Sequence, residues 1–590
     1  MYLFYLGEHV KCLIFLQLNH SGSTARVQPN NVMTVNSIER EHFVSSRHFF
    51  LWPLAEVYFR QAEKTLQHRR ATRAFSDLLT GGLRCLYAVL LDTTIEPRVE
   101  LLTRKRICEI LLHHTQEYAD AESILNRAML IAKQHNLVEE KFSLQLLLAR
   151  IFSKTSPKAG KVLLLRCIQE AQEYAKVMEM YGTQGIANAH KWVYEFYLCC
   201  SSFQGVQHIS KNIHNYAKPY NHQEMILLAS ILNQDLPMEE IPTRTHQIAV
   251  LVLITQIVKC VSEGKILQSR EKLNTVHMLL ESDTLKWESS HIDFTIDGET
   301  SIHLKWLSIS QIYILAYLIS GICYLPETSS GRASRFLQEG LRISGDFVPH
   351  EITVNEYFET DQWFYRIIDN IKCYLIAAHL SRSKFSKAEK ILSLNEVESN
   401  VFRNLLNGML KHKMGNFDEA ESIYRTILKN PDTPKDVFIL STLNLINLLQ
   451  DSTEASHSLE WLETSCKEQK NIVYSLWWMI LKVSRENTHV QKTNSLLRLT
   501  QHSAELSNTQ LQYVVFTELC TRLGNYEQAE KMASSALTLA RKSKDSIWSF
   551  FSGKNVEVLY QHVHDFEKLK RQKEENASMW EEIQKIFPSN

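Results

Sequence analysis

One stretch, Asn404–Pro431, constrains the fold more than any other part of the chain. It reads NLLNGMLKHKMGNFDEAESIYRTILKNP and contains two amphipathic helical segments joined by a short turn at Gly415. Gly408 in the first segment and Ala420 in the second are small enough to let two helices approach closely. Numbering Gly415 as position 15 of a 34-residue unit puts small residues at positions 8 and 20 and the aromatic Tyr424 at position 24. Such a helical hairpin cannot bury its apolar face alone, so one copy predicts others.

Clear or partial copies of this unit recur from about residue 100 to residue 545. Their spacing of small and aromatic residues is the tetratricopeptide (TPR) pattern. A single copy would be weak evidence, because any amphipathic helical hairpin with an alanine resembles it, but its recurrence indicates a TPR fold. The residues that we expect to set the helix-to-helix distance or the turn within these units are Ala121, Ala128, Gly321, Ala333, Gly408, Ala420, Gly524 and Ala529.

The sequence therefore predicts an all-α fold, a TPR-like α-solenoid in which antiparallel helix pairs form a right-handed superhelix. The chain holds 18 glycines and 12 prolines among 590 residues, against roughly 12% of these two residues in an average protein, which leaves little room for the tight turns of an all-β fold. A chain this long exceeds one compact core of about 250–300 residues, but a solenoid has no such limit.

Four regions are expected along the chain. Residues 1–50 form a leader without regular order, which ends near Trp52, where Pro53 suits a helix start. An N-terminal TPR-like array spans 51–240. Central TPR-like helices span 241–345, with an insertion loop near 283–303 that could hold a short hairpin. A C-terminal TPR array spans 346–590 and ends in a charged helix at 556–586.

Charge and cysteine usage exclude several classes of function. Lys plus Arg and Asp plus Glu number 65 each, so no net field draws the whole chain to nucleic acid or to an anionic membrane. The 11 cysteines lack metal-type spacing, and most lie in apolar helical runs, as buried thiols in a reducing compartment do. The apolar N-terminus is interrupted by Glu8 and Lys11 and is too short to span a bilayer, for which about 20 residues are needed.

The motifs of enzymes and cofactor sites are missing from the sequence. It has no Gly-rich phosphate loop, HExxH, GxSxG or kinase set. His113 and His114 fall on two different helix faces, and His562 and His564 lack a third metal ligand at a suitable spacing. The basic run Arg104–Arg106 reads as a solvated helix face rather than a phosphate site. We therefore expect no catalytic residue, no metal, no cofactor and no small-molecule substrate.

A long helical solenoid without catalytic or cofactor-binding motifs predicts a scaffold that binds other proteins. The inner groove of a TPR superhelix is lined by the first helix of each unit and holds extended or helical partner segments. Groove-facing positions are apolar here, which argues against co-chaperones that bind a C-terminal carboxylate through Lys, Arg and Asn. The candidate partner-binding residues are Leu315, Leu318, Ile322, Phe402, Leu405 and Met409. Packing of repeat on repeat explains the same side chains equally well.

Several segments, in order, resemble the TPR subunit of the cohesin loading complex, the cohesin loading factor family, particularly its fungal members. They include the Gly-Leu-x-Cys-Leu helix at 82–86, Glu-Pro-Arg at 96–98, and the tyrosine-alanine-glutamate turn at 118–122. Lys141–Phe142, Pro157–Ala159, and Trp306 with the YILAYLISGICYLP that follows belong to the same series. The resemblance covers most of residues 52–570.

This resemblance implies a non-enzymatic nuclear, chromatin-associated scaffold. Family members are understood to enclose the extended N-terminal segment of a large HEAT-repeat loader subunit as a heterodimer. Together the two load the cohesin complex onto chromatin and support sister-chromatid cohesion. The TPR subunit itself contacts chromatin mainly indirectly, because DNA contact belongs mainly to the large subunit. The alternative is a TPR subunit of another nuclear assembly, such as a ubiquitin ligase or a transcription complex. No membrane partner is expected.

Overall fold

A computed structural model gives the arrangement of the chain. It describes residues 48–67, 72–92, 95–115, 117–181, 185–200, 206–233, 246–281, 291–296, 300–345, 354–393, 401–449, 453–469, 471–485, 494–501, 508–521 and 525–586. The expected leader before residue 48 and the expected break around Pro237 and Pro242 lie outside these residues.

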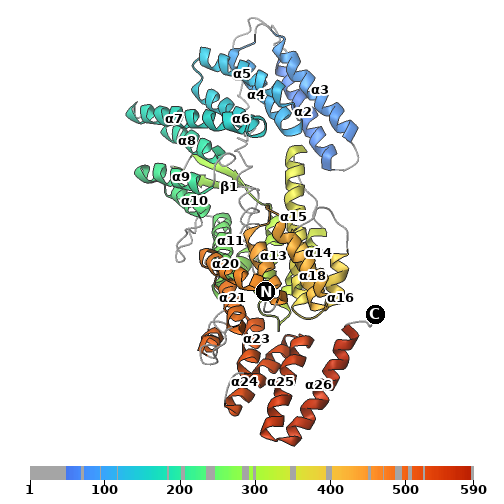
Figure 1. Cartoon of the computed structure of the whole chain (residues 1–590). Coiled ribbons are helices and arrows are strands. Elements are labelled where there is room, and N and C mark those ends of the chain that lie inside the picture. Colours follow the sequence, from blue (N-terminus) through green and yellow to red (C-terminus); the bar gives the residue numbers. More distant parts are fainter. Residues whose placement is uncertain are drawn as a thin grey trace.

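The described part of the chain is an array of antiparallel helices with one small hairpin (Figure 1). The first helices are α2 (His48–Gln67), α3 (Thr72–Leu90), α4 (Pro97–His114), α5 (Tyr118–Gln134), α6 (Val138–Thr155), α7 (Pro157–Tyr181), α8 (Ile186–Cys199), α9 (Val206–Tyr220) and α10 (Gln223–Asn233). The central elements are α11 (His246–Glu263), α12 (Ile266–Glu281), β1 (His291–Thr295), β2 (Ser301–Lys305), α13 (Ile309–Tyr324) and α14 (Arg332–Gly345).

The C-terminal half continues the same arrangement. Its helices are α15 (Val354–Leu380), α16 (Phe385–Leu392), α17 (Val401–Lys413), α18 (Phe417–Lys429), α19 (Lys435–Leu449), α20 (Thr453–Gln469), α21 (Ile472–Arg485), α23 (Thr509–Cys520), α24 (Tyr526–Lys542), α25 (Ser546–Val563) and α26 (Phe566–Ile586). Most helices pack chiefly on their neighbours in sequence. The all-α solenoid expected from the sequence is confirmed.

The hairpin of α17 and α18 closes as its small residues predict. A Cβ atom added to Gly408 would lie 2.7 Å from Cε1 of Tyr424, so any side chain there would push α18 away. Ala420 is fully buried on the facing helix. The turn places Gly415 at φ 84°, a left-handed conformation that glycine adopts without steric cost.

The other repeat residues lie at the same kind of close contact. Gly321 faces Leu337, and an added Cβ would overlap that side chain. The buried alanines, between 0% and 5% exposed, are Ala121, Ala128, Ala333, Ala420 and Ala529. Gly524 lies outside the described residues. The insertion at 283–303 contains a hairpin, in which β1 pairs antiparallel with β2 and Asp293 lies opposite His303.

Two expected helix boundaries were wrong. Pro53 does not start a helix, because α2 already begins at His48 and contains the proline. The expected final helix at 556–586 is two helices, since α25 ends at Val563 and α26 begins at Phe566. His564 at the break has a φ of 59°, which only a few per cent of non-glycine residues adopt and which the sequence does not signal.

The apolar core runs along the solenoid. One cluster of buried side chains extends from Phe142 to Ala540 and a second from Ala55 to Ile151, and helix α6 contributes to both. Helix α15 has 27 residues, about 40 Å at 1.5 Å per residue, and reaches from the central helices to α4 (Figure 1). The boundaries proposed at 240 and 345 stay predictions.

The C-terminal array curls back onto the central repeats at a contact that we call the seam. It comprises the turns that contain Gly264, Pro326–Thr328 and Ser381–Lys384, the starts of α21 and α23, and the turn Ser543–Asp545. Thr509 Oγ1 donates to the carbonyl of Pro326 at 3.0 Å, and Thr328 Oγ1 donates to Ser543 Oγ at 2.6 Å. These bonds join residues about 200 positions apart, so the seam holds the C-terminal helices against the central repeats.

Candidate partner-binding groove

A groove with a cavity of about 590 Å³ lies on the inner side of the C-terminal array. Its lining comes mainly from α17, α19, α21, α23 and α25, the first helices of successive pairs, and α26 closes one side. The lining residues are Met409, His412, Lys413, Gly415, Phe417, Asn444, Asn447, Trp477, Gln510, Val514, Ile547, Trp548, Phe550, Phe551, Trp580 and Ile583. A groove lined by first helices is what the TPR pattern predicts.

Aromatic side chains border this groove. Phe550 lies against Trp580, with ring centroids 5.1 Å apart, and so joins α25 to α26. Phe417 and Phe551 are each 56% exposed and Trp580 is 47% exposed. Large apolar side chains left this exposed around a concavity mark a surface that another protein covers.

The polar residues of the groove carry amides, one ammonium and the imidazole of His412, and its tryptophans carry indole N–H groups. Lys413 Nζ donates to the carbonyl of Leu380 at 3.0 Å, and burial lowers the pKa of Lys413. The side-chain amides of Asn447 and Gln510 form no hydrogen bond to any described residue, although Gln510 is only 8% exposed. No carboxylate is among the described residues that line the groove.

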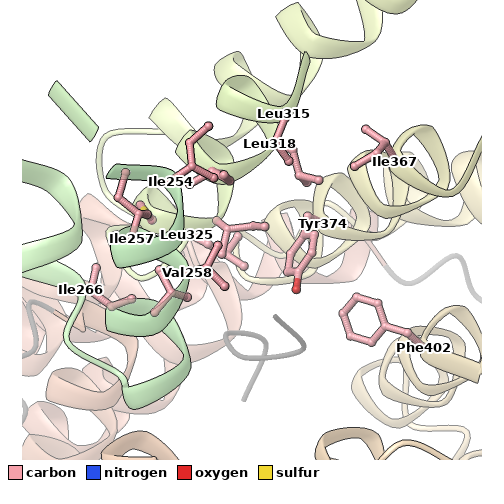
Figure 2. Packing of buried hydrophobic residues seen from close by; sticks show 14 of the residues in the cluster. Ile254, Ile257, Val258, Ile266, Leu315, Leu318, Leu325, Ile367, Tyr374 and Phe402 are labelled. Atoms are coloured by element: carbon pink, nitrogen blue, oxygen red, sulfur yellow. The ribbon is translucent and has the colours of Figure 1, made fainter. Parts of the chain in front are cut away.

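The six residues proposed from the sequence as partner contacts are side chains of the core. Leu315, Leu318, Ile322, Phe402 and Leu405 are 0–1% exposed, and Met409 is 4% exposed. Figure 2 shows Leu315 and Leu318 of α13 in one cluster with Ile254 of α11, Ile367 and Tyr374 of α15, and Phe402 of α17. This burial favours packing of repeat on repeat, the second of the two interpretations left open by the sequence.

Of these six residues, Met409 alone lines the groove. Sequence reasoning missed the groove residues Gln510, Phe551 and Trp580. The aromatic run Trp548–Phe551 was a signal that could have pointed to α25. Three aromatic residues within four positions cannot all lie on the one helix face that packs against the core.

Basic side chains gather beside the seam. Burial lowers the pKa of Lys384, and the charges of Arg382, Lys387 and Lys544 lower it further. Burial also lowers the pKa of Arg382, with Arg335 adding to the effect. The side chains come from α14, the α15–α16 turn, α16 and the α24–α25 turn, so the fold collects like charges that are dispersed in the sequence. The basic run at 104–106 is neutralised instead, because Arg104 pairs with Glu100, and Arg106 with Glu56.

The described residues form neither a metal site nor a helix that could cross a membrane. Among the described residues, no three side chains of His, Cys, Asp or Glu gather around a possible metal position. None of the described helices has both the length and the apolar content needed to cross a bilayer.

Comparison with known protein families gives the decisive observation. The sequence model of the cohesin loading factor family matches residues 47–567, almost nine-tenths of the chain. The chain belongs to the cohesin loading factor family. The resemblance drawn from the sequence is thereby confirmed.

The fold of this cohesin loading factor is also similar to that of solved structures. A crystal structure of Scc4 in complex with Scc2n and Ctf19n matches with a TM-score of 0.70 at 11% identity, covering 92% of this chain and 100% of that one. A structure of Scc4 in complex with Scc2n matches with the same score and coverage at 12% identity. A search of curated protein sequences found no match.

Proposed function

We propose that this cohesin loading factor is the non-enzymatic scaffold subunit of a cohesin loader. Its superhelix encloses the extended N-terminal segment of a large HEAT-repeat subunit, and the heterodimer promotes cohesin loading onto chromatin and sister-chromatid cohesion. The observation that carries the proposal is the open aromatic groove on the inner face of a chain that belongs to this family. The fold neighbour Scc4 was crystallised with Scc2n, which supports the choice of partner.

The groove explains how a protein without catalytic groups acts in such a complex. A superhelix that surrounds an unfolded partner segment buries a large area of that segment. The segment becomes ordered on binding and follows a single route through the superhelix. The scaffold then determines where the rest of the large subunit is held. Nuclear, chromatin-associated localisation follows from this role, with contact to chromatin made mainly by the large subunit.

Co-expression of the chain with the large HEAT-repeat subunit from the same organism tests the proposal. We expect a stable one-to-one complex in size-exclusion chromatography with light scattering, and poorer solubility of the chain expressed alone. Capture of a ubiquitin ligase or transcription assembly in place of the loader subunit would favour the alternative TPR scaffold. Deleting the N-terminal segment of the large subunit should abolish the complex, and a complex that survives the deletion would contradict the proposal.

A further inference from the structure

We infer that the C-terminal groove binds an extended, uncharged stretch of the partner segment that carries at least one aromatic or large aliphatic side chain. This inference rests on the proposed function and specifies what the groove recognises. Three observations support it, and they concern the charge of the lining, its unpaired amides and its exposed aromatic rings.

The charge of the lining selects against acidic and basic stretches. No Asp or Glu is among the described lining residues, so a Lys or Arg of the partner would lose water without gaining an ion pair. Lys413, the ammonium in the lining, is committed to the carbonyl of Leu380 at 3.0 Å. An uncharged stretch is therefore favoured.

The unpaired amides favour an extended main chain over a helix. Gln510 on α23 is 8% exposed and Asn447 on α19 is exposed, and neither side-chain amide has a hydrogen bond to the described residues. Neither amide has a buried polar atom without a partner, so both reach water, and a ligand that displaces this water must offer hydrogen bonds in its place. A helix satisfies its own N–H and C=O groups, whereas an extended segment presents both, and an amide side chain can donate to one and accept from the other.

The aromatic rings supply a place for an anchoring side chain. Phe551 and Trp580 face the cavity from α25 and α26, and each has about half of its surface exposed. A cavity of about 590 Å³ falls within the range of about 300–1,000 Å³ that is usual for ligand pockets. Aromatic anchors that fill such pockets commonly dominate the affinity of a protein interface.

Photo-crosslinking within the intact heterodimer tests this inference. The probe is p-benzoylphenylalanine placed at Phe551, in full-length chain co-purified with the full-length large subunit, and the crosslinked peptide is identified by mass spectrometry. We expect a crosslink to an uncharged stretch of the large subunit's N-terminal segment with a bulky apolar residue. A crosslink to a charged stretch, to residues 1–47 of this chain or to a second copy would overturn the inference, as would the absence of any crosslink.

A substitution at Gln510 tests the role of the amide. Gln510→Leu keeps the volume of the side chain and removes its hydrogen bonds, and we expect the N-terminal segment to dissociate about 5–10-fold faster from the variant, which corresponds to roughly one hydrogen bond to the main chain. Gln561→Leu is the matched control, because Gln561 is exposed on α25 and does not line the groove. Equal dissociation rates in both variants would overturn the role of Gln510. If no heterodimer forms at all, the proposed function itself fails, and this outcome is distinct from the others.

Discussion

Small side chains at single positions set the distance between the two helices of each repeat. In the α17–α18 pair, Gly408 allows Tyr424 to approach, and Ala420 is fully buried. The same kind of contact recurs at Gly321 and Leu337 in the α13–α14 pair. These residues therefore belong to the fold, and they determine function only by placing the inner helices.

Replacing Ala420 by arginine should open the α17–α18 pair. We expect a loss of several kcal/mol in the free energy of unfolding, because overpacking costs about 1–3 kcal/mol and burying an unpaired charge adds to it. Thermal denaturation followed by circular dichroism measures the effect. The control is Ser422→Arg, which places the same side chain on the exposed face of α18. If Ala420→Arg melted like its control, our account of this repeat would be wrong.

A second residue-scale feature is the uncharged histidine beneath the basic side chains of the seam. His379 is 5% exposed, and its Nδ1 has no hydrogen-bond partner. Burial lowers the pKa of His379 to about 4, and the nearby charges of Lys384, Lys387 and Arg382 contribute to this shift. Its imidazole is therefore neutral in the folded protein well below the usual pKa of 6.5.

This histidine should make the protein less stable in mild acid. Between about pH 6.5 and pH 4 the unfolded chain protonates His379 and the folded chain does not, so stability falls as the pH decreases through this range. His379→Phe should show a smaller decrease in melting temperature over the same range and little change at pH 7.5. Some dependence remains, because burial also lowers the pKa of His190 and His277. An unchanged pH profile in the variant would contradict the assignment.

At the scale of secondary-structure elements, the start of α25 connects three parts of the C-terminal half. Asp545 is fully buried and caps α25 by accepting from the Trp548 N–H. Its carboxylate also accepts from Ser383 Oγ in the α15–α16 turn and from the Tyr513 hydroxyl on α23, both at 2.8 Å. One side chain therefore caps a helix and ties two other elements to it.

Removing this carboxylate should destabilise the C-terminal array strongly. Asp545→Ala loses a helix cap and two hydrogen bonds that the carboxylate accepts from buried hydroxyl groups, for a total of about 3 kcal/mol. Asp545→Asn retains one acceptor oxygen and should lose less. The measurement is the denaturant concentration at the midpoint of unfolding. Equal midpoints for Asp545→Ala and the unaltered protein would show that the seam does not hold the array together.

A helix or helix boundary could be predicted where the residues that determine it lie close together in the sequence. Helix pairs such as α17–α18 were predictable, because small residues and the turn glycine lie within one repeat. The start of α2 was not, since Pro53 reads as a helix start although α2 already begins at His48. Similarly, a break at His564 depends on a left-handed residue that is not glycine.

Groove residues were harder to predict than helices because neighbouring repeats decide which positions stay open. Phe402 has the sequence position of a groove residue, but Tyr374 of α15 lies against it, with ring centroids 5.5 Å apart. In contrast, Gln510 resembles any surface amide until its burial beside the cavity is known. The sequence pattern identifies the inner helix of a pair but does not show which neighbour covers it.

For the whole molecule, the seam and the groove are parts of one arrangement. The turns of the central repeats hold α21, α23 and α25 through bonds such as the one from Asn471 Nδ2 to the carbonyl of Ser262, at 3.1 Å. The cavity lies among α17, α19, α23 and α25, and the seam holds the starts of α23 and α25 beside it. A scaffold of this kind holds its partner by shape, in agreement with the proposal for the cohesin loader.

Hydrogen–deuterium exchange tests the central claim most directly. The chain is compared alone and in complex with the N-terminal segment of the large loader subunit, peptide by peptide. We predict slower exchange on the groove helices α17, α19, α21, α23 and α25, and little change on the outer helices α20 and α24. Slower exchange confined to the outer helices, or no change anywhere, would contradict a superhelix that encloses its partner.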